Sequence, residues 1–545
     1  MARATDPSDQ ERRQSARLRR DRAKKKLHEL LSYSVDEDFC RMIWAIREIQ
    51  TRDGQVASGI FKTPDETKRA KISSPFYIYP WALETLVNEL LTTSKVVRPR
   101  FANGPSYYLN CGLWQTLANL LNALRDWEDG QDGMTISSDR VFHEMARIGH
   151  QQFAWQRGFL NAPATYRSAF LFGGPEARTK LEKEGASLDA LMAIGLAGYT
   201  AFEHGPYVAE RLDLTLLGLD AAAVAGGMGR LSTPLAALRD EATRLRSGRT
   251  HPAYAPSALR MHPLIRSGQY PGQLLSPLPE LLLVRTTTGL YYDVVGGGLS
   301  VRHEIGGRFE TYVDGLLSRA IPSRQFRREE GYRYRGNTIN TPDILVYDQG
   351  VLNVVVECKA TKMTYDDRFG EEAVSGGRGF EELAKGAFQV WRHFAHSRLG
   401  LTRDTQVSDD AIGMVVTLDP WFQMSGELRD RVLVRARALA AEKDVGIVEE
   451  DCRRIVFAYI EDIEFALLRT TDEGFFRLLQ NATHNDRLGY MLFTMVDELA
   501  EEHRMSKPYP FRDDIGDILG WWRRLREDHD GAVEKDEDQS LDDIG

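Results

Sequence analysis

Two short stretches of the chain combine a Pro-Asp pair with a Glu-x-Lys triplet: "TPDETK" at residues 63–68 and "TPDILVYDQGVLNVVVECK" at residues 341–359. Two carboxylates that converge on one divalent cation, with a lysine beside the attacking water, would support metal-dependent hydrolysis. This chemistry needs a rigid platform that aims the side chains at one point. A chain of this length contains roughly one or two Glu-x-Lys triplets by chance, so the surrounding sequence has to decide between the stretches.

The second stretch predicts a β-hairpin. Its continuous, valine-rich run "LNVVVECK" is typical of a strand buried on both faces. Because side chains alternate along a strand, Glu357 and Lys359 would project from one face and Cys358 from the other. The preceding "DILVYD" is also strand-like, and residues 348–350 supply a turn. Pairing the two strands would bring Asp343 close to Glu357.

The first stretch lacks such a frame. The segment "KTPDETKRAK" is polar throughout, contains Pro64 and has no apolar run on either side. This pattern predicts a surface turn or the start of a helix, with nothing to aim the acids and the lysine at a common point.

Two predicted helices supply further polar side chains. In "GGRFETYVDGLL", Glu310 borders an apolar stripe, from which its carboxylate could reach a neighbouring strand. In "FEELAKGAFQVWRHFAH", apolar residues share one face, and the opposite face carries Lys385, Gln389, Arg392 and His396. These four side chains could donate hydrogen bonds to phosphates. The alternative is an ordinary solvated helix face, favoured at roughly two to one if the helix stood alone.

The order of these elements resembles the core of the PD-(D/E)xK, or restriction-endonuclease-like, nuclease superfamily. That order is a helix with Glu310, a strand at Pro342-Asp343, a strand ending at Glu357-Cys358-Lys359, a helix with Lys385 and Gln389, and the strand "AIGMVVTLD". The resemblance covers about residues 305–459. Gln389 resembles the helix glutamine of the RecB-like and Holliday-junction-resolvase branches, but His393 stands where RecB-like nucleases often have a tyrosine.

The resemblance implies a metal-dependent mechanism. Asp343, Glu357 and the backbone carbonyl of Cys358 would bind Mg²⁺, for which Mn²⁺ could substitute, and Glu310 is a further candidate ligand. Lys359 would orient or deprotonate a water for in-line attack on a phosphodiester. The implied catalytic set is Asp343, Glu357, Lys359, Glu310 and Gln389.

The resemblance also assigns the polar helix face to substrate binding. Its residues Lys385, Gln389, Arg392 and His396 would bind the nucleic-acid backbone, a kind of contact that positions a nucleic acid without reading its sequence.

Hydrophobic patterning predicts an α/β region with a large, mainly α-helical N-terminal domain and a helical C-terminal extension. The resemblance implies that the α/β region is a restriction-endonuclease-like nuclease core. Strands are predicted at "LLLVRTT", "DILVYD", "LNVVVEC", "AIGMVVTLD" and "RIVFAYI". The predicted parts are a basic arm at 1–34, a mainly helical domain of unknown role at 35–250, a connector and start of the nuclease domain at 251–300, the nuclease core at 301–465, C-terminal helices at 466–526 and an acidic disordered tail at 527–545.

Charge and composition narrow the class of protein. The net charge of −9 is uneven, since "ERRQSARLRRDRAKKK" is basic and the C-terminal tail is acidic. The basic arm suits phosphate or RNA binding about as well as it suits a solvated helix. The four cysteines lack metal-type spacing and are expected to be reduced and mostly buried. Without an apolar run of about 20 residues or a signal peptide, we expect a cytoplasmic protein without a membrane partner.

These observations favour a metal-dependent nuclease that acts on DNA, of the kind found in bacterial restriction or anti-phage defence. The helical domain would supply target recognition, regulation or contacts with a second copy or a partner protein. A non-catalytic nucleic-acid-binding or assembly protein that keeps the fold is one alternative. A repair or junction-processing nuclease is another, with the same chemistry on a different substrate shape.

Overall fold

The computed structural model describes residues 7–52, 54–96, 108–135, 148–149, 151–152, 154–156, 158–159, 161–248, 251–362, 377–404, 406–420 and 426–526. The chain divides into two compact units. The helical unit consists of Met1–Leu160, Lys180–Asp293 and Leu519–Gly545, and the α/β unit of Asn161–Thr179 and Val294–Ile518. This division differs from the predicted one, because most of the predicted connector lies in the helical unit.

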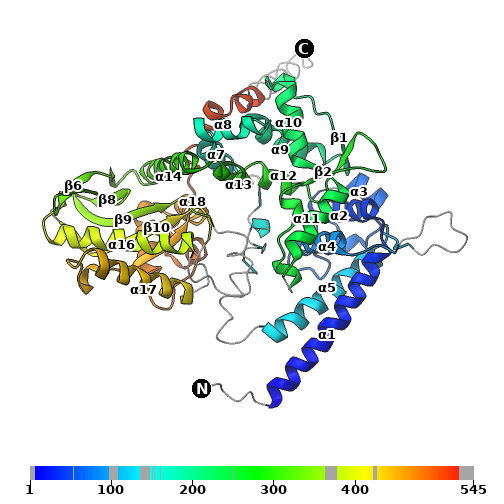
Figure 1. Ribbon diagram of the computed structural model, residues 1–545, viewed down its shortest axis with the longest axis horizontal. Helices are drawn as coiled ribbons and strands as arrows, with labels where there is room; N and C mark the ends of the chain where they lie inside the picture. The colour runs from blue at the N-terminus through cyan, green and yellow to red at the C-terminus, as the bar shows by residue number, and fades with distance from the viewer. Residues whose placement is uncertain are drawn as a thin grey trace, which may run out of the picture. The chain divides into compact units, whose positions relative to one another are not determined.

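Amphipathic helices build the helical unit, as their apolar spacing predicted. Helix α4 begins at Pro80, which occupies its first turn, and buries Leu83, Leu86 and Leu90. Helix α1 runs alongside α5 (Figure 1) and buries Leu27 of the predicted basic arm. The helices are α1 (Pro7–Ser32), α2 (Asp36–Thr51), α3 (Gln55–Ile60), α4 (Pro80–Thr92), α5 (Trp114–Thr135), α9 (Leu188–Ala201), α10 (Ala221–Leu231), α11 (Leu235–Arg246) and α12 (Glu280–Arg285).

A small sheet of short strands completes the helical unit. Its order is β1-β4-β3-β2, with β1 (Tyr207–Ala209), β2 (Ser232–Pro234), β3 (Leu264–Arg266) and β4 (Gln273–Leu275). The prediction of a strand at "LLLVRTT" is wrong, since these residues form α12 and its C-terminal turn. Leu281, Leu282 and Leu283 are all buried, and a short apolar run does not distinguish a buried strand from a buried helix.

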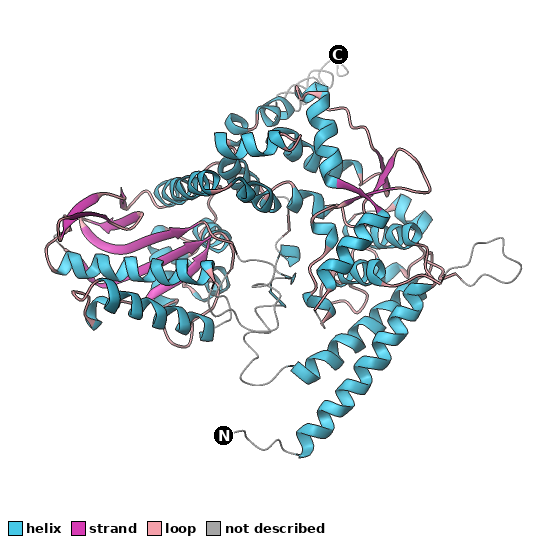
Figure 2. Cartoon of the chain, viewed as in Figure 1, coloured by secondary structure: helices cyan, strands magenta, loops and turns pink. Residues whose placement is uncertain are grey.

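A five-stranded mixed sheet organises the α/β unit (Figure 2), with the order β11-β10-β9-β8-β5. Strands β5, β8 and β9 pair antiparallel, whereas β10 pairs parallel to both β9 and β11. The strands are β5 (Gln325–Arg328), β8 (Ile344–Asp348), β9 (Val351–Lys359), β10 (Val407–Thr417) and β11 (Ile455–Tyr459). A separate hairpin pairs β6 (Gly331–Tyr334) with β7 (Asn337–Asn340).

Helices cover the sheet. Helix α16 (Arg378–Arg398) packs on β9 and β10, with α17 (Gly426–Lys443) beside it, and its residues Leu383, Ala387, Val390 and Trp391 share a core with the strands. Helix α14 (Leu299–Ala320) contacts β9 and β5, and α18 (Ile460–Arg469) contacts β11. The element order α14–β8–β9–α16–β10 is the expected one.

Helix α7 (Ala162–Phe172) joins the α/β unit through a polar cluster. The buried guanidinium of Arg167 pairs with Glu464 and donates to Glu461 Oε1 at 2.9 Å, while the Tyr312 hydroxyl donates to Glu464. These partners lie about 300 residues from Arg167 along the chain, so no local pattern predicted this placement.

The C-terminal extension is less helical than predicted. Within the predicted C-terminal helices at 466–526, α19 (Asp472–Asn481) follows α18, but residues 490–503 contain only α20 (Leu492–Met495) and short 3₁₀ turns. All four cysteines are free, and Cys40, Cys111 and Cys358 are buried, as predicted. Of the helices within the described ranges, none has the length and apolar character to cross a membrane.

Candidate active site

The predicted hairpin of β8 and β9 is present in the register that the site needs. Its two-residue turn places Gln349 and Gly350 at positive φ, 48° and 84°, a backbone conformation that closes tight antiparallel hairpins. Ile344 pairs with Val356, and one residue further along each strand Asp343 comes opposite Glu357. The two acids therefore lie at the same end of the hairpin and on the same face.

Asp343 accepts a hydrogen bond from the neighbouring strand, and burial and nearby negative charges disfavour its ionised form. The Cys358 backbone N–H donates to Asp343 Oδ2 at 2.6 Å. Burial, followed by the negative charges of Glu357 and Glu310, raises the pKa of Asp343 to about 8, although the Cys358 N–H opposes the shift. Although Lys359 opposes the shift as well, the raised pKa favours the protonated carboxyl at neutral pH when no metal ion is bound.

Glu357, Lys359 and Gln389 form a connected triplet. Lys359 Nζ donates to Glu357 Oε1 at 2.6 Å and to Gln389 Oε1 at 3.2 Å. Burial disfavours the charged form of Lys359, but the Glu357 carboxylate outweighs that cost and raises the pKa of Lys359. Glu357 is only 2% exposed, and its second oxygen, Oε2, is buried without a hydrogen-bond partner within the described chain.

That orphaned oxygen fits a divalent cation. Buried carboxylate oxygens are normally paired, so an unpaired one calls for a ligand that the chain itself does not supply. Two acids with oxygen donors at one end of a hairpin match the preference of Mg²⁺ for oxygen ligands and retained waters. No group of three or more His, Cys, Asp and Glu side chains is placed to bind a metal ion within the described residues. The candidate protein ligands are thus Asp343, Glu357 and the backbone carbonyl of Cys358.

Glu310 lies at the margin of the site. It is half-buried on α14, and burial, then the charges of Glu329 and Glu357, raise the pKa of its carboxyl. Its electrostatic coupling to Asp343 and Glu357 places it near them, but it completes no metal-binding group. Glu310 is thus placed to influence the charge of the site.

A glycine that the sequence analysis missed lets α16 approach the triplet. A Cβ atom added at Gly386 would lie 3.3 Å from Lys359 Cε and 3.5 Å from Glu357 Cγ. Gly386 therefore packs directly against both side chains. An isolated glycine inside a helical pattern often marks a close contact with a neighbouring element, so the sequence did carry a signal for this approach.

The polar face of α16 divides into three environments. Lys385 is exposed, Gln389 is half-buried beside Lys359, and Arg392 is half-buried and donates to the Asn340 carbonyl at 3.3 Å. The prediction that His396 contacts a phosphate is wrong. Its side chain is fully buried, because the β6–β7 hairpin covers this end of the helix.

His396 is occupied by protein partners. Its Nδ1 lies 2.7 Å from the Tyr332 hydroxyl, and its Nε2 lies 2.8 Å from Asp444 Oδ2. Burial lowers the pKa of His396, which favours the neutral ring. His396 thus fixes the hairpin to α16.

The first Pro-Asp and Glu-x-Lys stretch is a surface turn, as predicted. Residues Asp65–Thr67 form a 3₁₀ turn, and Lys68 Nζ lies 2.7 Å from Asp65 Oδ1. Both side chains are exposed, at 54% and 88%. An exposed pair of this kind contributes little and offers no enclosed site.

Comparisons with protein-family models, curated proteins and solved structures gave no match for this chain.

Proposed function

We propose that the protein is a metal-dependent nuclease of the PD-(D/E)xK type, acting on DNA. The observation that carries the proposal is the convergence of Asp343, Glu357 and Lys359 at one end of the hairpin, with Glu357 Oε2 buried and unpaired. The order α14–β8–β9–α16–β10, on which the resemblance rests, supports it.

Each residue has a definable part in phosphodiester hydrolysis. Asp343 and Glu357 would hold Mg²⁺, which when bound polarises the phosphate and offsets its developing charge. The raised pKa of Lys359 favours a charged ammonium that orients a water or donates to the phosphate, rather than a base that removes a proton. Gln389, which accepts from Lys359 Nζ, would fix the position of that ammonium.

The wider biological role follows by analogy alone. A large helical unit joined to a nuclease unit suits a bacterial restriction or anti-phage effector, with the helical unit contacting a target, a partner protein or a second copy. Within the described residues, no third His, Cys, Asp or Glu side chain is placed to share a metal ion with Asp343 and Glu357. This observation favours one alternative, a nucleic-acid-binding protein that keeps the fold without the chemistry.

Cleavage assays with matched variants test the proposal. Supercoiled, linear and single-stranded DNA and RNA would be incubated with Mg²⁺ or Mn²⁺ and the wild type, Asp343→Asn or Lys359→Met. We expect both variants to lose at least about 100-fold in rate, because each removes a group required in the transition state. Asp65→Asn and Lys68→Met, in the matching surface stretch, should cut like the wild type.

A second measurement keeps the test decisive if no substrate is cut. Mg²⁺ should raise the melting temperature of the wild type but not of Glu357→Gln, since bound ligand stabilises the folded state. A wild type that neither cuts nor responds to Mg²⁺ contradicts the proposal. A wild type that cuts equally well after Asp343→Asn removes the reaction from this site.

A further inference from the structure

A cationic cavity lies next to the candidate active site. It occupies about 320 Å³ between the β6–β7 hairpin, α16 and the C-terminal end of α17. This volume lies within the range of small-ligand sites, about 300–1,000 Å³. Among the lining residues are Arg335, Lys385, Gln389, Arg392, Lys443 and Asp444.

The charge of the cavity is unbalanced. Arg335, Lys385, Arg392 and Lys443 supply four positive charges, and none of them forms an ion pair with a carboxylate of the described chain. The acid, Asp444, already accepts from the Tyr334 hydroxyl at 2.9 Å and pairs with His396. Arg392 Nε is buried without an acceptor within the described residues. Unpaired cations around one cavity favour an anionic ligand.

The walls of the cavity are held in place before any ligand arrives. Tyr332 and Tyr334 of β6 bond to His396 and Asp444, and Arg392 bonds to the Asn340 carbonyl of β7. These bonds tie both strands of the hairpin to the helices opposite. Such a preformed site avoids part of the ordering cost of binding.

Gln389 joins the cavity to the catalytic lysine. Its Oε1 accepts from Lys359 Nζ at 3.2 Å, and the same side chain lines the cavity. An amide whose oxygen is occupied keeps two N–H donors on its nitrogen. Gln389 can therefore donate to a ligand in the cavity while it holds Lys359.

We propose that this cavity binds a backbone phosphate of the substrate strand beside the phosphate that is cut, and that Gln389 couples its occupancy to Lys359. The identification of the ligand as the substrate strand rests on the proposed nuclease function, whereas the phosphate site itself rests on the cavity and its charges. Arginine and lysine side chains are the usual partners of nucleic-acid phosphates, and such contacts fix the register of the strand.

Salt-dependent binding measures these phosphate contacts directly. A fluorescent single strand of about 12 nucleotides and the corresponding duplex would be titrated in EDTA, so that binding is read without cleavage. In the double variant Lys385→Gln/Lys443→Gln we expect affinity to fall roughly 10- to 30-fold. The slope of log affinity against log salt should shrink by about 1.4 on the single strand or about 1.8 on the duplex.

Arg437→Gln provides the matched control. Arg437 is an exposed cation on α17, like Lys443, but it pairs with Glu449 and does not line the cavity. Its slope should equal that of the wild type, and unchanged melting temperatures would show that all variants fold. A slope that does not change in the double variant overturns the cavity proposal.

The source of the phosphate is tested with free anions. The oligonucleotide should bind at least about 100-fold more tightly than inorganic phosphate or dAMP, because a strand makes several contacts at once. A free nucleotide that binds as tightly as the strand overturns the strand assignment.

The two proposals fail separately. Cleavage that requires Asp343, together with unchanged binding in the double variant, leaves the nuclease function and removes the cavity site. Binding that depends on Lys385 and Lys443, in a wild type that neither cuts nor responds to Mg²⁺, leaves the phosphate site and removes the catalytic proposal.

Discussion

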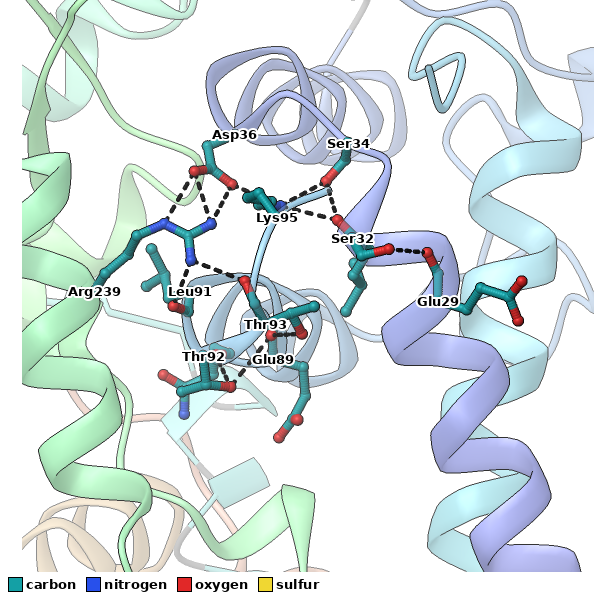
Figure 3. A network of polar contacts seen from close by, with 12 residues as sticks. Glu29, Ser32, Ser34, Asp36, Glu89, Leu91, Thr92, Thr93, Lys95 and Arg239 are labelled. Atoms are coloured by element: carbon teal, nitrogen blue, oxygen red, sulfur yellow. Dashed lines mark hydrogen bonds and ion pairs between the residues drawn. The ribbon is translucent and has the colours of Figure 1, made fainter. Parts of the chain in front are cut away.

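Asp36 in the helical unit and Glu357 in the α/β unit both pair with a lysine in a largely buried setting, yet their surroundings differ. Asp36 meets two cations, since Lys95 Nζ lies 2.9 Å from Oδ1 and Arg239 Nη2 lies 2.8 Å from Oδ2 (Figure 3). The remaining donors also have partners. Arg239 donates to the carbonyls of Leu91 and Thr93, and Lys95 donates to Ser34 Oγ.

The cluster at Glu357, in contrast, is incomplete, because it has neither balanced charges nor a partner for every buried polar atom. Glu357 and Asp343 share one lysine, with Glu310 adding to the negative charge, and Glu357 Oε2 has no partner within the described chain. A cluster that satisfies its own charges stabilises the fold and needs nothing more. A cluster with surplus negative charge and a free buried oxygen is suited to a cation from solution. The balance of charge, and not the presence of buried acids, separates the two.

The largest expected effect breaks the satisfied cluster. Asp36→Asn removes the negative charge and leaves Lys95 and Arg239 against each other. We expect it to lower the free energy of unfolding by about 3 kcal/mol, because an unpaired buried charge is costly. In EDTA, Glu357→Gln should lower the free energy of unfolding by less than about 1 kcal/mol. Lys359 still has the Asp343 carboxyl as a neighbour, and the repulsion between Glu357 and Asp343 is removed. Urea denaturation followed by circular dichroism compares the two variants, and equal losses would erase the distinction between the clusters.

Metal binding should act on only one of the clusters. At Mg²⁺ concentrations of tens to a hundred times Kd, the wild type should gain about 2 kcal/mol in the free energy of unfolding. Glu357→Gln and Asp343→Asn should lose this gain, whereas Asp36→Asn, although destabilised, should keep it. Thermal melts with Mg²⁺ and with EDTA measure the difference. A gain that survives in Glu357→Gln would place the cation elsewhere.

The pKa of Asp343 predicts how stability changes with pH in EDTA. A carboxyl whose pKa is raised on folding, here to about 8, favours the folded state while it is protonated. Its contribution is complete below the ordinary pKa and is lost as pH rises towards 8, by about 1 kcal/mol per pH unit. Asp343→Asn should flatten this decline.

Protons and Mg²⁺ should therefore compete at Asp343. In the wild type the stabilisation by Mg²⁺ should increase from pH 6 to pH 8, since a proton must leave Asp343 before the cation binds. Melting temperatures across this range, with and without Mg²⁺, provide the measurement. A response to Mg²⁺ that weakens as pH rises would show that Asp343 is not a ligand.

The sequence predicted the centre of the site because its signals are local. The valine run and the turn before Val351 predicted two paired strands that bring Asp343 and Glu357 to the same end of the hairpin. Their exact pairing was not predicted, because strict pairing across the two-residue turn would place Asp343 opposite Val356. A register shift between Val346 and Tyr347 brings Asp343 opposite Glu357 instead. The prediction of a strand where α12 forms was wrong, because a short apolar run is compatible with either a buried strand or a buried helix.

Features that depend on contacts between residues far apart in the sequence could not be predicted from local patterns. The hairpin of β6 and β7 is polar and partly exposed, so no apolar pattern predicted it, yet it buries His396 and forms one wall of the cavity. Helix α7 joins the α/β unit through Arg167 and Glu464, residues far apart in sequence. Gly386 belongs to the same class, because its role appears only when the helix lies against the strand.

Gly386 offers the finest test of the incomplete cluster. Alanine favours a helix over glycine by about 1 kcal/mol, but the new methyl would press on Lys359 Cε, so the net change in unfolding free energy should stay below about 1 kcal/mol. Cleavage should fall about tenfold, because small displacements of catalytic groups are costly. Gly307→Ala in α14, where an added Cβ meets nothing within 4 Å, should stabilise the protein without altering cleavage. If Gly386→Ala gained the same stability and cut at the wild-type rate, the close approach of α16 would matter for packing alone, and the position of Lys359 would not depend on it.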